Sequence, residues 1–150
     1  MKKPLATTLL VLVFFFCHTS AHADALTQGK KRARQEDKPV VAYFFSQHCV
    51  YCEQMQKNVL NDRTIADSLK NDTVYVPVDV DKQEATALAY RVRGTPTTLV
   101  LESTGKRIVE IPGYMSKDDF KMLLAYVKGR HYKMMGFGEF LRSARAASGR

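Results

Sequence analysis

A cysteine pair that closely follows an apolar run limits the fold of this chain more than any other feature. Residues 40–45 are all apolar or aromatic, and Cys49-Val50-Tyr51-Cys52 comes soon after them, at the start of a helix-like segment. Apolar side chains on both faces predict a central strand that is covered on two sides. The two cysteines are therefore predicted to lie at a strand-to-helix junction.

This position favours thiol chemistry at Cys49. The first N–H groups of a helix have no partner inside the helix, and its aligned peptide dipoles attract negative charge, so a thiolate there is stabilised and the thiol pKa is lowered. Cys52 falls on nearly the same face, and helix geometry places the two Cα atoms about 5 Å apart, within the range of a disulfide. We expect the pair to open and close with little backbone movement.

Residues 1–23 have the form of an export signal. Met1-Lys2-Lys3 is a basic start, residues 5–16 are almost entirely apolar, and Ala21-His22-Ala23 fits a signal peptidase site. The apolar run is shorter than the ~20 residues of a comfortable membrane span. We expect cleavage after Ala23 and a periplasmic mature protein; an uncleaved anchor, or lipid attachment at Cys17, is the alternative.

Export would leave Cys49 and Cys52 as the only cysteines of the mature chain. Exported proteins ordinarily use paired cysteines as structural staples. A bridge that closes so short a loop, however, constrains the unfolded chain very little. Disulfide exchange therefore explains this pair better than stability does.

The chain is basic, with a formal net charge of +8, and much of the excess lies near the two ends of the mature sequence. The residues concerned are Lys30, Lys31, Arg32 and Arg34 at one end, and Lys128, Arg130, Lys133, Arg142, Arg145 and Arg150 at the other. No recognised nucleic-acid module accompanies these runs, so we expect a solvated basic face and no nucleic-acid partner. A weak preference for anionic lipid headgroups or acidic partners stays open.

The rest of the chain predicts one domain in which helices alternate with strands before a final hairpin. Helices are expected over 25–37, 51–69, 82–91 and 117–128, and strands over 40–45, 74–80, 97–102 and 107–111. Pro77 cannot donate to a strand ladder, so the strand over 74–80 is expected at an edge or bulged there. This order predicts an α/β fold with a mixed sheet and helices on both faces.

Several residues of these helices have expected positions. The second helix is kinked or broken near Asn61-Asp62, and its buried stripe is formed by Met55, Val59, Ile65 and Leu69. The helix over 82–91 is expected to turn Ala85, Leu88 and Ala89 inward. Ser116 suits the N-cap of the closing helix.

Three motifs, in this order, resemble the thioredoxin superfamily over about residues 38–128. They are Cys49-Val50-Tyr51-Cys52 after the apolar strand, Gly94-Thr95-Pro96-Thr97 before the next core strand, and Gly113 after the last strand. A zinc site would need a second cysteine pair, and haem attachment would need a histidine where Glu53 stands. The resemblance implies the thioredoxin fold, preceded by a helical lead-in over 24–37 and followed by a basic helical extension over 129–150.

The resemblance also implies roles for four residues. Cys49 is similar to the exposed nucleophile that attacks a substrate disulfide, and Cys52 to the buried thiol that resolves the mixed disulfide, so the two are expected to form the disulfide of the oxidised protein. Pro96 matches the family's cis-proline. That conformation would place Thr95 beside the sulfurs, with its backbone free to pair with an extended substrate.

Two further residues have open roles. His48 is expected to stabilise the Cys49 thiolate as a donor or a cation, and Tyr51 to shape the surface that meets the substrate. The alternative for both is an exposed loop side chain without a catalytic part.

The chain departs from a typical thioredoxin around the cysteines. It has His48 in place of tryptophan before the first cysteine, Val50-Tyr51 in place of Gly-Pro between them, and Tyr43 where a buried acid assists the resolving thiol. Proton transfer from Cys52 must then use water or another group. Glu53, Asp79 and the Tyr43 hydroxyl are the candidates, and aromatic core filling is the favoured role of Tyr43.

The resemblance implies a thiol:disulfide oxidoreductase without a bound cofactor or metal. Cys-x-Tyr-Cys, with threonine before the proline, is more similar to periplasmic disulfide isomerases and reductases than to the strong oxidant, and residues 24–40 leave no room for an isomerase's dimerisation domain. We therefore expect a monomer that reduces disulfides of exported proteins and is itself reduced by a membrane thiol-electron donor. Net oxidation or isomerisation is an alternative. A change of about 30 mV in the reduction potential of the pair corresponds to only about 1.4 kcal/mol, so the resemblance does not fix the direction of net electron flow.

A binding module is a second hypothesis from a different class. In that case the cysteines capture a thiophilic ion such as Cu(I), with His48 completing a soft site. Tight metal binding without turnover would distinguish it from an enzyme.

The tail over 129–150 extends beyond the usual end of the family. Phe137, Phe140 and Leu141 have helical spacing, which predicts an amphipathic helix over 138–147 that packs on the domain. A partner-docking helix is the alternative. His131, beyond the closing helix, is expected to be solvated.

Overall fold

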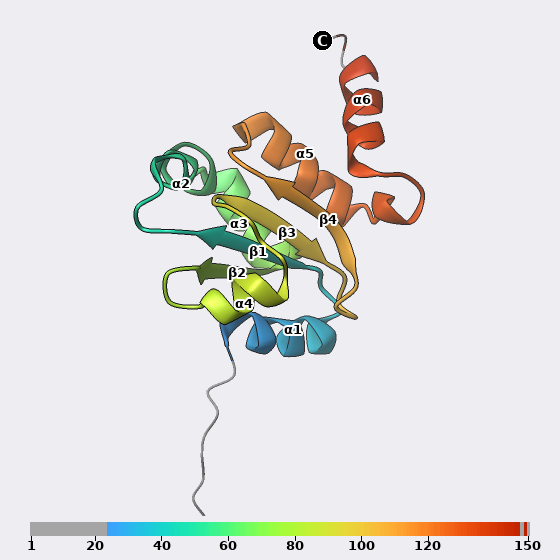
Figure 1. Cartoon of the computed structure of the whole chain (residues 1–150). Coiled ribbons are helices and arrows are strands. Elements are labelled where there is room, and N and C mark those ends of the chain that lie inside the picture. The colour runs from blue at the N-terminus through green and yellow to red at the C-terminus, as the bar shows by residue number, and fades with distance from the viewer. Residues whose placement is uncertain (1–23, 148, 150) are drawn as a thin grey trace, which may run out of the picture.

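The structure, a computed structural model, describes residues 24–147 and 149 of the 150-residue chain. The expected signal peptide and Cys17 lie outside the described residues. Figure 1 shows a twisted sheet with helices around it. Its strands are β1 (Val40–Phe45), β2 (Val74–Asp79), β3 (Thr97–Leu101) and β4 (Arg107–Pro112), in the order β2-β1-β3-β4.

The helices follow the predicted order, with additions that the sequence pattern did not predict. They are α1 (Ala25–Glu36), α2 (Val50–Met55), the π-helical η1 (Gln56–Leu60), α3 (Arg63–Asp72), α4 (Glu84–Ala89), α5 (Lys117–Lys128), the 3-10 helix η2 (His131–Lys133) and α6 (Phe137–Ala147). The predicted break at Asn61-Asp62 is confirmed, because the Asp62 side chain caps α3 by accepting from the N–H groups of Thr64 and Ile65. Within the described residues, every helix is too short or too polar to cross a membrane.

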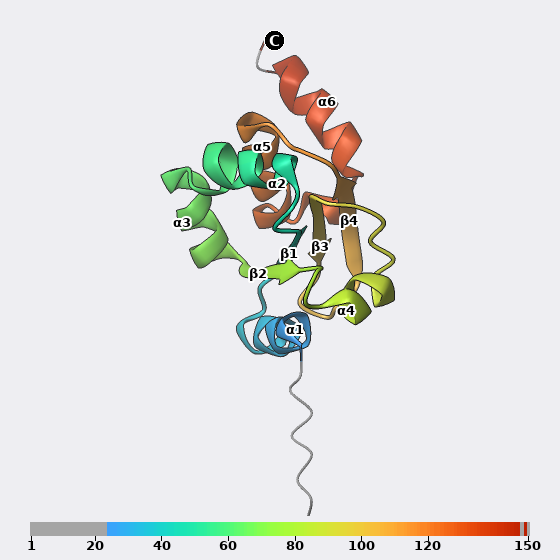
Figure 2. The same cartoon turned by 60° about the vertical axis from the view of Figure 1, so that its left-hand side comes forward.

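Strand β1 is the centre of the sheet. It pairs in parallel with β2 and antiparallel with β3, and β3 forms the predicted hairpin with β4. Val41 and Tyr43 belong to the core beneath α2, α3 and α5, while Ala42 and Phe44 belong to the core beneath α1. Figure 2 shows these two groups of helices on opposite sides of the sheet. The predicted mixed sheet with both faces covered is confirmed.

Strand β2 lies at an edge, as Pro77 indicates. The N–H groups of Val74 and Val80 donate to Pro39 O and Phe45 O, so by the alternation of a parallel strand the even-numbered residues of β2 face β1. Pro77 therefore stands where its missing N–H would point to the free edge. A proline is tolerated there because no ladder bond is lost.

The inward face predicted for α4 is wrong. Leu88 is 67% exposed, and Ala85 and Ala89 are also exposed, whereas Thr86 and Ala87 are buried. The pattern assumed a helix over 82–91, but α4 has only six residues and its cap residue Gln83 makes no side-chain capping bond. In so short a helix, its attachment to neighbouring loops decides which side meets the sheet.

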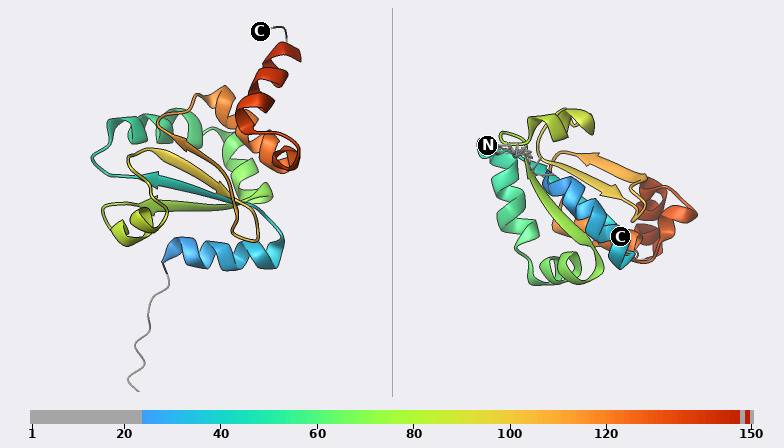
Figure 3. Two further views of the ribbon diagram at one scale, coloured as in Figure 1. Left: turned by 45° about the vertical axis from the view of Figure 1, so that its right-hand side comes forward. Right: turned by 90° about the horizontal axis from the view of Figure 1, so that it is seen from below.

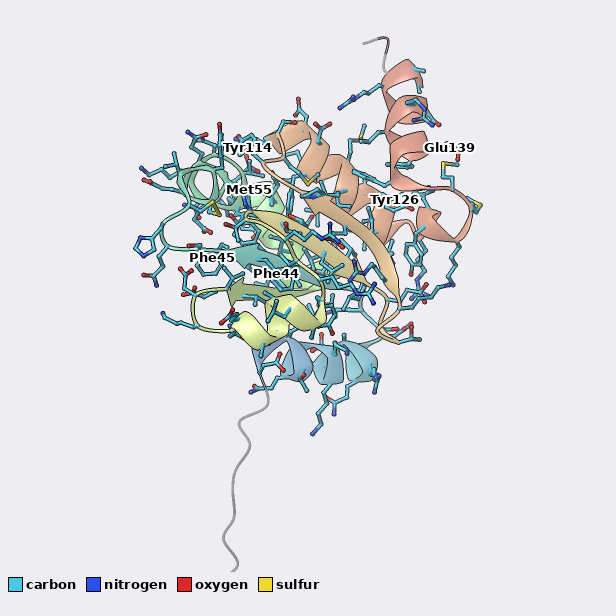
Figure 4. The ribbon with its side chains drawn as sticks, in the orientation of Figure 1. Phe44, Phe45, Met55, Tyr114, Tyr126 and Glu139 are labelled. Atoms are coloured by element: carbon cyan, nitrogen blue, oxygen red, sulfur yellow. A yellow bond between two sulfur atoms is a disulfide. The ribbon has the colours of Figure 1, made fainter. Side chains whose placement is uncertain are left out.

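The closing helix α5 begins as predicted, because Ser116 Oγ accepts from the N–H of Asp119. Beyond α5, helix α6 packs through Phe137 and Phe140, whose rings lie 5.3 Å from that of Tyr126. Figure 4 places Tyr126 on α5 near the base of α6, and Figure 3 shows the rest of α6 rising away from the sheet.

His131 is less exposed to solvent than the sequence analysis predicted. Its ring is half-buried and lies 4.8 Å from that of Phe140. The turn η2 folds the chain back after α5, and this brings His131 under the first turns of α6. The amphipathic helix is thus present and packs on the domain.

Candidate active site

Cys49 and Cys52 form a disulfide at the predicted strand-to-helix junction, with 5.2 Å between their Cα atoms. Cys49 is the N-cap of α2, and the N–H of Cys52 donates to Cys49 Sγ over 3.1 Å. Cys49 is partly exposed, whereas Cys52 is 4% exposed. A backbone donor aimed at the more accessible sulfur is the arrangement that stabilises a thiolate at that position.

The other two motif segments lie at the same end of the sheet. Thr97 pairs with Phe44 near the end of β1, and Pro96 and Thr95 come directly before it. The Thr95–Pro96 peptide bond is cis, the isomer that the resemblance implies. Gly113, which has a φ of 87°, donates its N–H to Pro96 O over 2.7 Å. This bond ties the loop after β4 to the one before β3.

His48 and Tyr51 point outward. His48 is exposed, and its backbone N–H donates to Ser46 Oγ. Tyr51 is 63% exposed, and so is its neighbour Val50, at 65%. Their roles in catalysis or substrate contact stay predictions.

Tyr114 is an exposed aromatic side chain that the sequence analysis missed. It follows Gly113 in the loop before α5, and it is 42% exposed. Its position next to the third family motif was the signal that could have found it. Together with Val50 and Tyr51, it offers apolar surface at this end of the molecule.

A cavity of about 320 Å³ borders both cysteines. Its lining is mostly apolar and includes Tyr43, Phe45 and Gln56, with Glu53 of α2 and Lys57 of η1. Tyr43 and Phe45 stack with ring centroids 5.8 Å apart. Figure 4 shows Phe45 at the end of β1 that leads to α2. The sulfur of Cys52 therefore lies beside space that a small molecule or side chain can enter.

The three candidates for accepting the Cys52 proton have different environments. Tyr43 is buried and its hydroxyl donates to Cys52 O over 3.3 Å; burial raises its pKa to about 12. Glu53 is exposed, and a hydrogen bond from Lys57 lowers its pKa. Asp79 is buried but is held by Gln47 and Lys82. Glu53 is thus a candidate that is ionised at neutral pH and lines the same cavity as Cys52.

A polar network before Cys49 was also missed from the sequence. Asp81 accepts hydrogen bonds from Ser46 Oγ (2.8 Å) and from the N–H of Gln47 (3.1 Å). These bonds lower the pKa of Asp81. Because β1 and β2 are parallel, the loops that follow them meet at one edge of the sheet. The available signal was an acidic residue, Asp81, just after β2, because β2 pairs with β1 and the loop after β1 leads to Cys49.

The soft metal site considered from the sequence is not assembled among the described residues. No three side chains of the histidine, cysteine, aspartate or glutamate type lie close enough there to hold an ion together. His48 lies next to Cys49 in the chain, but its exposed side chain does not complete such a set with the two sulfurs.

Comparison with known proteins gives consistent matches to one family. The model of the thioredoxin-like domain family matches residues 26–128. The thiol:disulfide interchange protein DsbD of Pseudoalteromonas atlantica is 28% identical over 103 residues, which cover 65% of this chain and 17% of that protein. The chain therefore spans less than a fifth of the length of this relative.

Two solved structures are similar over most of their length. A thioredoxin from Thermus thermophilus is 30% identical with a TM-score of 0.60, and the match covers 67% of this chain and 81% of that one. The C-terminal domain of Neisseria meningitidis DsbD, in its reduced form, is 26% identical with a TM-score of 0.59, over 69% of this chain and 94% of that one. The region that the family model matches, residues 26–128, contains the cysteine pair and excludes α6.

Proposed function

This chain belongs to the thioredoxin-like family and is a thiol:disulfide oxidoreductase, and from this premise we propose that it reduces disulfides of exported proteins. The observation that carries the proposal is the donation of the Cys52 N–H to Cys49 Sγ at the N-cap of α2. This contact stabilises the thiolate of Cys49. A stabilised thiolate is present near neutral pH, where it can attack a disulfide.

The proposed reaction consists of two exchanges. The Cys49 thiolate attacks one sulfur of the substrate disulfide, which forms a mixed disulfide and expels a substrate thiolate that takes a proton from solvent. Cys52 then loses its proton to solvent and attacks Cys49 Sγ, which forms the Cys49–Cys52 bond and expels the second substrate sulfur as a thiolate that takes up a proton from solvent. Two electrons pass to the substrate, which is reduced, and the pair is oxidised.

The next cycle needs a donor of two electrons, and we propose a membrane protein that carries a dithiol of lower potential. It would attack the Cys49–Cys52 disulfide by the same exchange in reverse. Similarity to interchange proteins named DsbD supports a place in such a chain of exchanges. The proposed compartment is the periplasm, to which residues 1–23 would direct the chain before they are cleaved off.

The test uses the mature chain and a model protein disulfide, with dithiothreitol as donor. The wild type is expected to accelerate reduction and Cys49→Ser to abolish the acceleration. In the absence of dithiothreitol, reduced Cys52→Ser is expected to accumulate a mixed disulfide with the substrate. A matched control is Ser143→Cys in α6, which adds a thiol away from the pair and should leave the rate unchanged. Reduction without acceleration by the wild type would refute the proposal.

The direction of electron flow is tested by the equilibrium potential of the pair. A value near about −270 mV, as in thioredoxin, supports a reductant, and one near about −120 mV indicates an oxidant. In a parallel titration, tight Cu(I) binding that survives excess competing thiol, together with absent turnover, would instead favour the metal-binding module.

A further inference from the structure

We propose that Ser46 and Asp81 form a clamp that positions Cys49 for thiolate formation. The inference rests on the proposed exchange at Cys49 and identifies two positioning residues for it. Neither side chain touches a sulfur in the structure, so each acts through the backbone of the loop before α2.

The first part of the clamp is a chain of hydrogen bonds from the loop after β2 to the loop after β1. Asp81 Oδ2 accepts from Ser46 Oγ over 2.8 Å, and Ser46 Oγ in turn accepts from the N–H of His48 over 3.2 Å. The same carboxylate oxygen accepts from the N–H of Gln47 over 3.1 Å. Two consecutive backbone N–H groups are thus held, directly or through one hydroxyl, by one carboxylate.

The second part holds the carboxylate itself. The N–H of Asp81 donates to Asp79 Oδ1 over 3.1 Å, and Asp79 is only 8% exposed. Asp79 Oδ2 also receives Gln47 Nε2 over 3.3 Å and lies 3.3 Å from Lys82 Nζ. The anchor is therefore a buried group on the strand that runs parallel to β1.

The clamp reaches Cys49 through one turn of backbone. The N–H of Cys49 donates to Ser46 O over 3.3 Å, so residues 46–49 form a turn whose first member is clamped. Cys49 leaves this turn with extended φ and ψ of −98° and 105°, which is the conformation that places its Sγ over the N–H of Cys52. Loosening residues 46–48 should therefore let the sulfur move away from the donor that stabilises its anion.

The negative charge of Asp81 by itself should raise the pKa of Cys49, whereas the hydrogen bonds of the clamp should lower it. The two contributions can therefore be separated by variants. A carboxylate near Cys49 disfavours a second negative charge, so removing the Asp81 charge by itself should lower the thiol pKa. Removing the Ser46 hydroxyl leaves every charge in place and breaks two hydrogen bonds, the one that it donates to Asp81 and the one that it accepts from the N–H of His48. Ser46→Ala is consequently the sharper variant.

The clamp should be intact over the whole range in which thiols titrate. Hydrogen bonds from Ser46 and Gln47 lower the pKa of Asp81, and the other charged or titratable groups that face it are Asp79, Lys82 and His48. Asp81 is ionised well below neutral pH. Disrupting the clamp should therefore shift the pKa of Cys49 without adding a second transition to its titration curve.

The experiment measures the pKa of Cys49 in the reduced mature chain, from the pH dependence of its alkylation rate. Ser46→Ala is expected to raise this pKa by about half a unit, which corresponds to an about threefold smaller thiolate fraction below the pKa. The double variant Ser46→Ala/Asp81→Asn should show less of a rise than Ser46→Ala alone, because loss of the Asp81 charge acts in the opposite direction.

The chain offers a matched control. Ser103 Oγ donates to Asp37 Oδ1 over the same 2.8 Å, between the end of β3 and the residue after α1, at the opposite end of β1 from Cys49. Ser103→Ala should lower the melting temperature about as much as Ser46→Ala and leave the Cys49 pKa unchanged. A pKa that is the same in Ser46→Ala as in the wild type, or that rises equally in Ser103→Ala, would overturn the clamp.

Failure of the clamp and failure of the proposed function give different results. If the wild type reduces the model disulfide and Ser46→Ala titrates like it, only the clamp is refuted. If the wild type has an ordinary Cys49 pKa and does not accelerate reduction, both are refuted.

Discussion

Tyr43 occupies the position where the resemblance would place a buried acid. The ring is 2% exposed, and its hydroxyl donates to Cys52 O. That carbonyl also accepts from the N–H of Gln56, so it keeps a partner without the phenol. Because burial raises the pKa of Tyr43 to about 12, the hydroxyl is neutral at the pH where thiols exchange. We infer that Tyr43 fills the core and does not take the proton of Cys52.

Tyr43→Phe is therefore expected to keep thiol-disulfide exchange activity within about twofold and to lose about 1 kcal/mol or less of stability at neutral pH, the cost of one such hydrogen bond. The folded-state pKa lies above the ordinary value of 10.0, so the stability linked to the protonated phenol is complete below pH 10 and is lost as pH rises toward 12. The variant should lose less stability over that range.

Urea unfolding at several pH values and the model disulfide assay check both expectations. Tyr132→Phe, at a half-buried tyrosine in η2, controls for the loss of a phenol outside the segment that carries the two cysteines. A tenfold fall in activity of Tyr43→Phe alone would show that the hydroxyl takes part in proton transfer.

At the scale of elements, the contact between α1 and β2 depends on one glycine. A Cβ built on Gly29 would lie 2.4 Å from Val76 Cγ2, far inside normal contact. The missing side chain lets the helix approach the edge strand and cover Val74 and Val76, which are buried. The sequence shows a glycine in a helix, where it lowers helix propensity, and only packing explains its presence.

Gly29→Ala should lower the free energy of unfolding by about 1–3 kcal/mol, because overpacking outweighs the gain in helix propensity. Chemical denaturation of the variant measures this. Gly138→Ala is the matched control, since its Cβ would meet only Arg142 Nη1, at 3.7 Å, and it should be neutral or stabilising. An equal stabilisation of both variants would contradict the packing argument.

At the scale of the whole molecule, α6 is an addition to the thioredoxin-like domain, whose family match ends at residue 128. Ring contacts to Tyr126 and an ion pair between Arg145 and Asp119 join it to α5, and the Tyr126 hydroxyl donates to Met135 O, just before α6, over 2.7 Å. Figure 1 shows α5 between α6 and α2. Other basic residues at the two ends are also paired, in Arg32–Glu36, Lys128–Asp72 and Arg130–Asp37.

Phe140→Ala should loosen α6 and lower stability by about 1–2 kcal/mol, through lost aromatic contacts and burial, while activity stays unchanged. Hydrogen exchange should accelerate in α6 and stay slow in β1. Met134→Ala, at a side chain that is 74% exposed, serves as the control and should change neither. Loss of activity in Phe140→Ala with a protected core would assign α6 a part in catalysis.

Much of the fold was predictable because its signals are local. The apolar run of β1, the cap at Ser116 and the proline of β2 each act within a few residues, and the structure has each where the pattern predicts it. The inward face of α4 and the surroundings of His131 were predicted wrongly. Both depend on how a short element is held by neighbours that are distant in the sequence.

The sequence by itself determined that Cys49 and Cys52 lie on one face at the start of a helix that follows a central strand. The spacing of the two cysteines and the apolar run before them suffice for that. Only the tertiary structure decided what surrounds them: the neutral Tyr43 beneath the pair, the cavity beside Cys52, and the carboxylate of Asp81 holding the loop before Cys49. These contacts join residues whose proximity comes from the parallel pairing of β1 with β2 and from the packing of α2 over the sheet, and no local pattern encodes that.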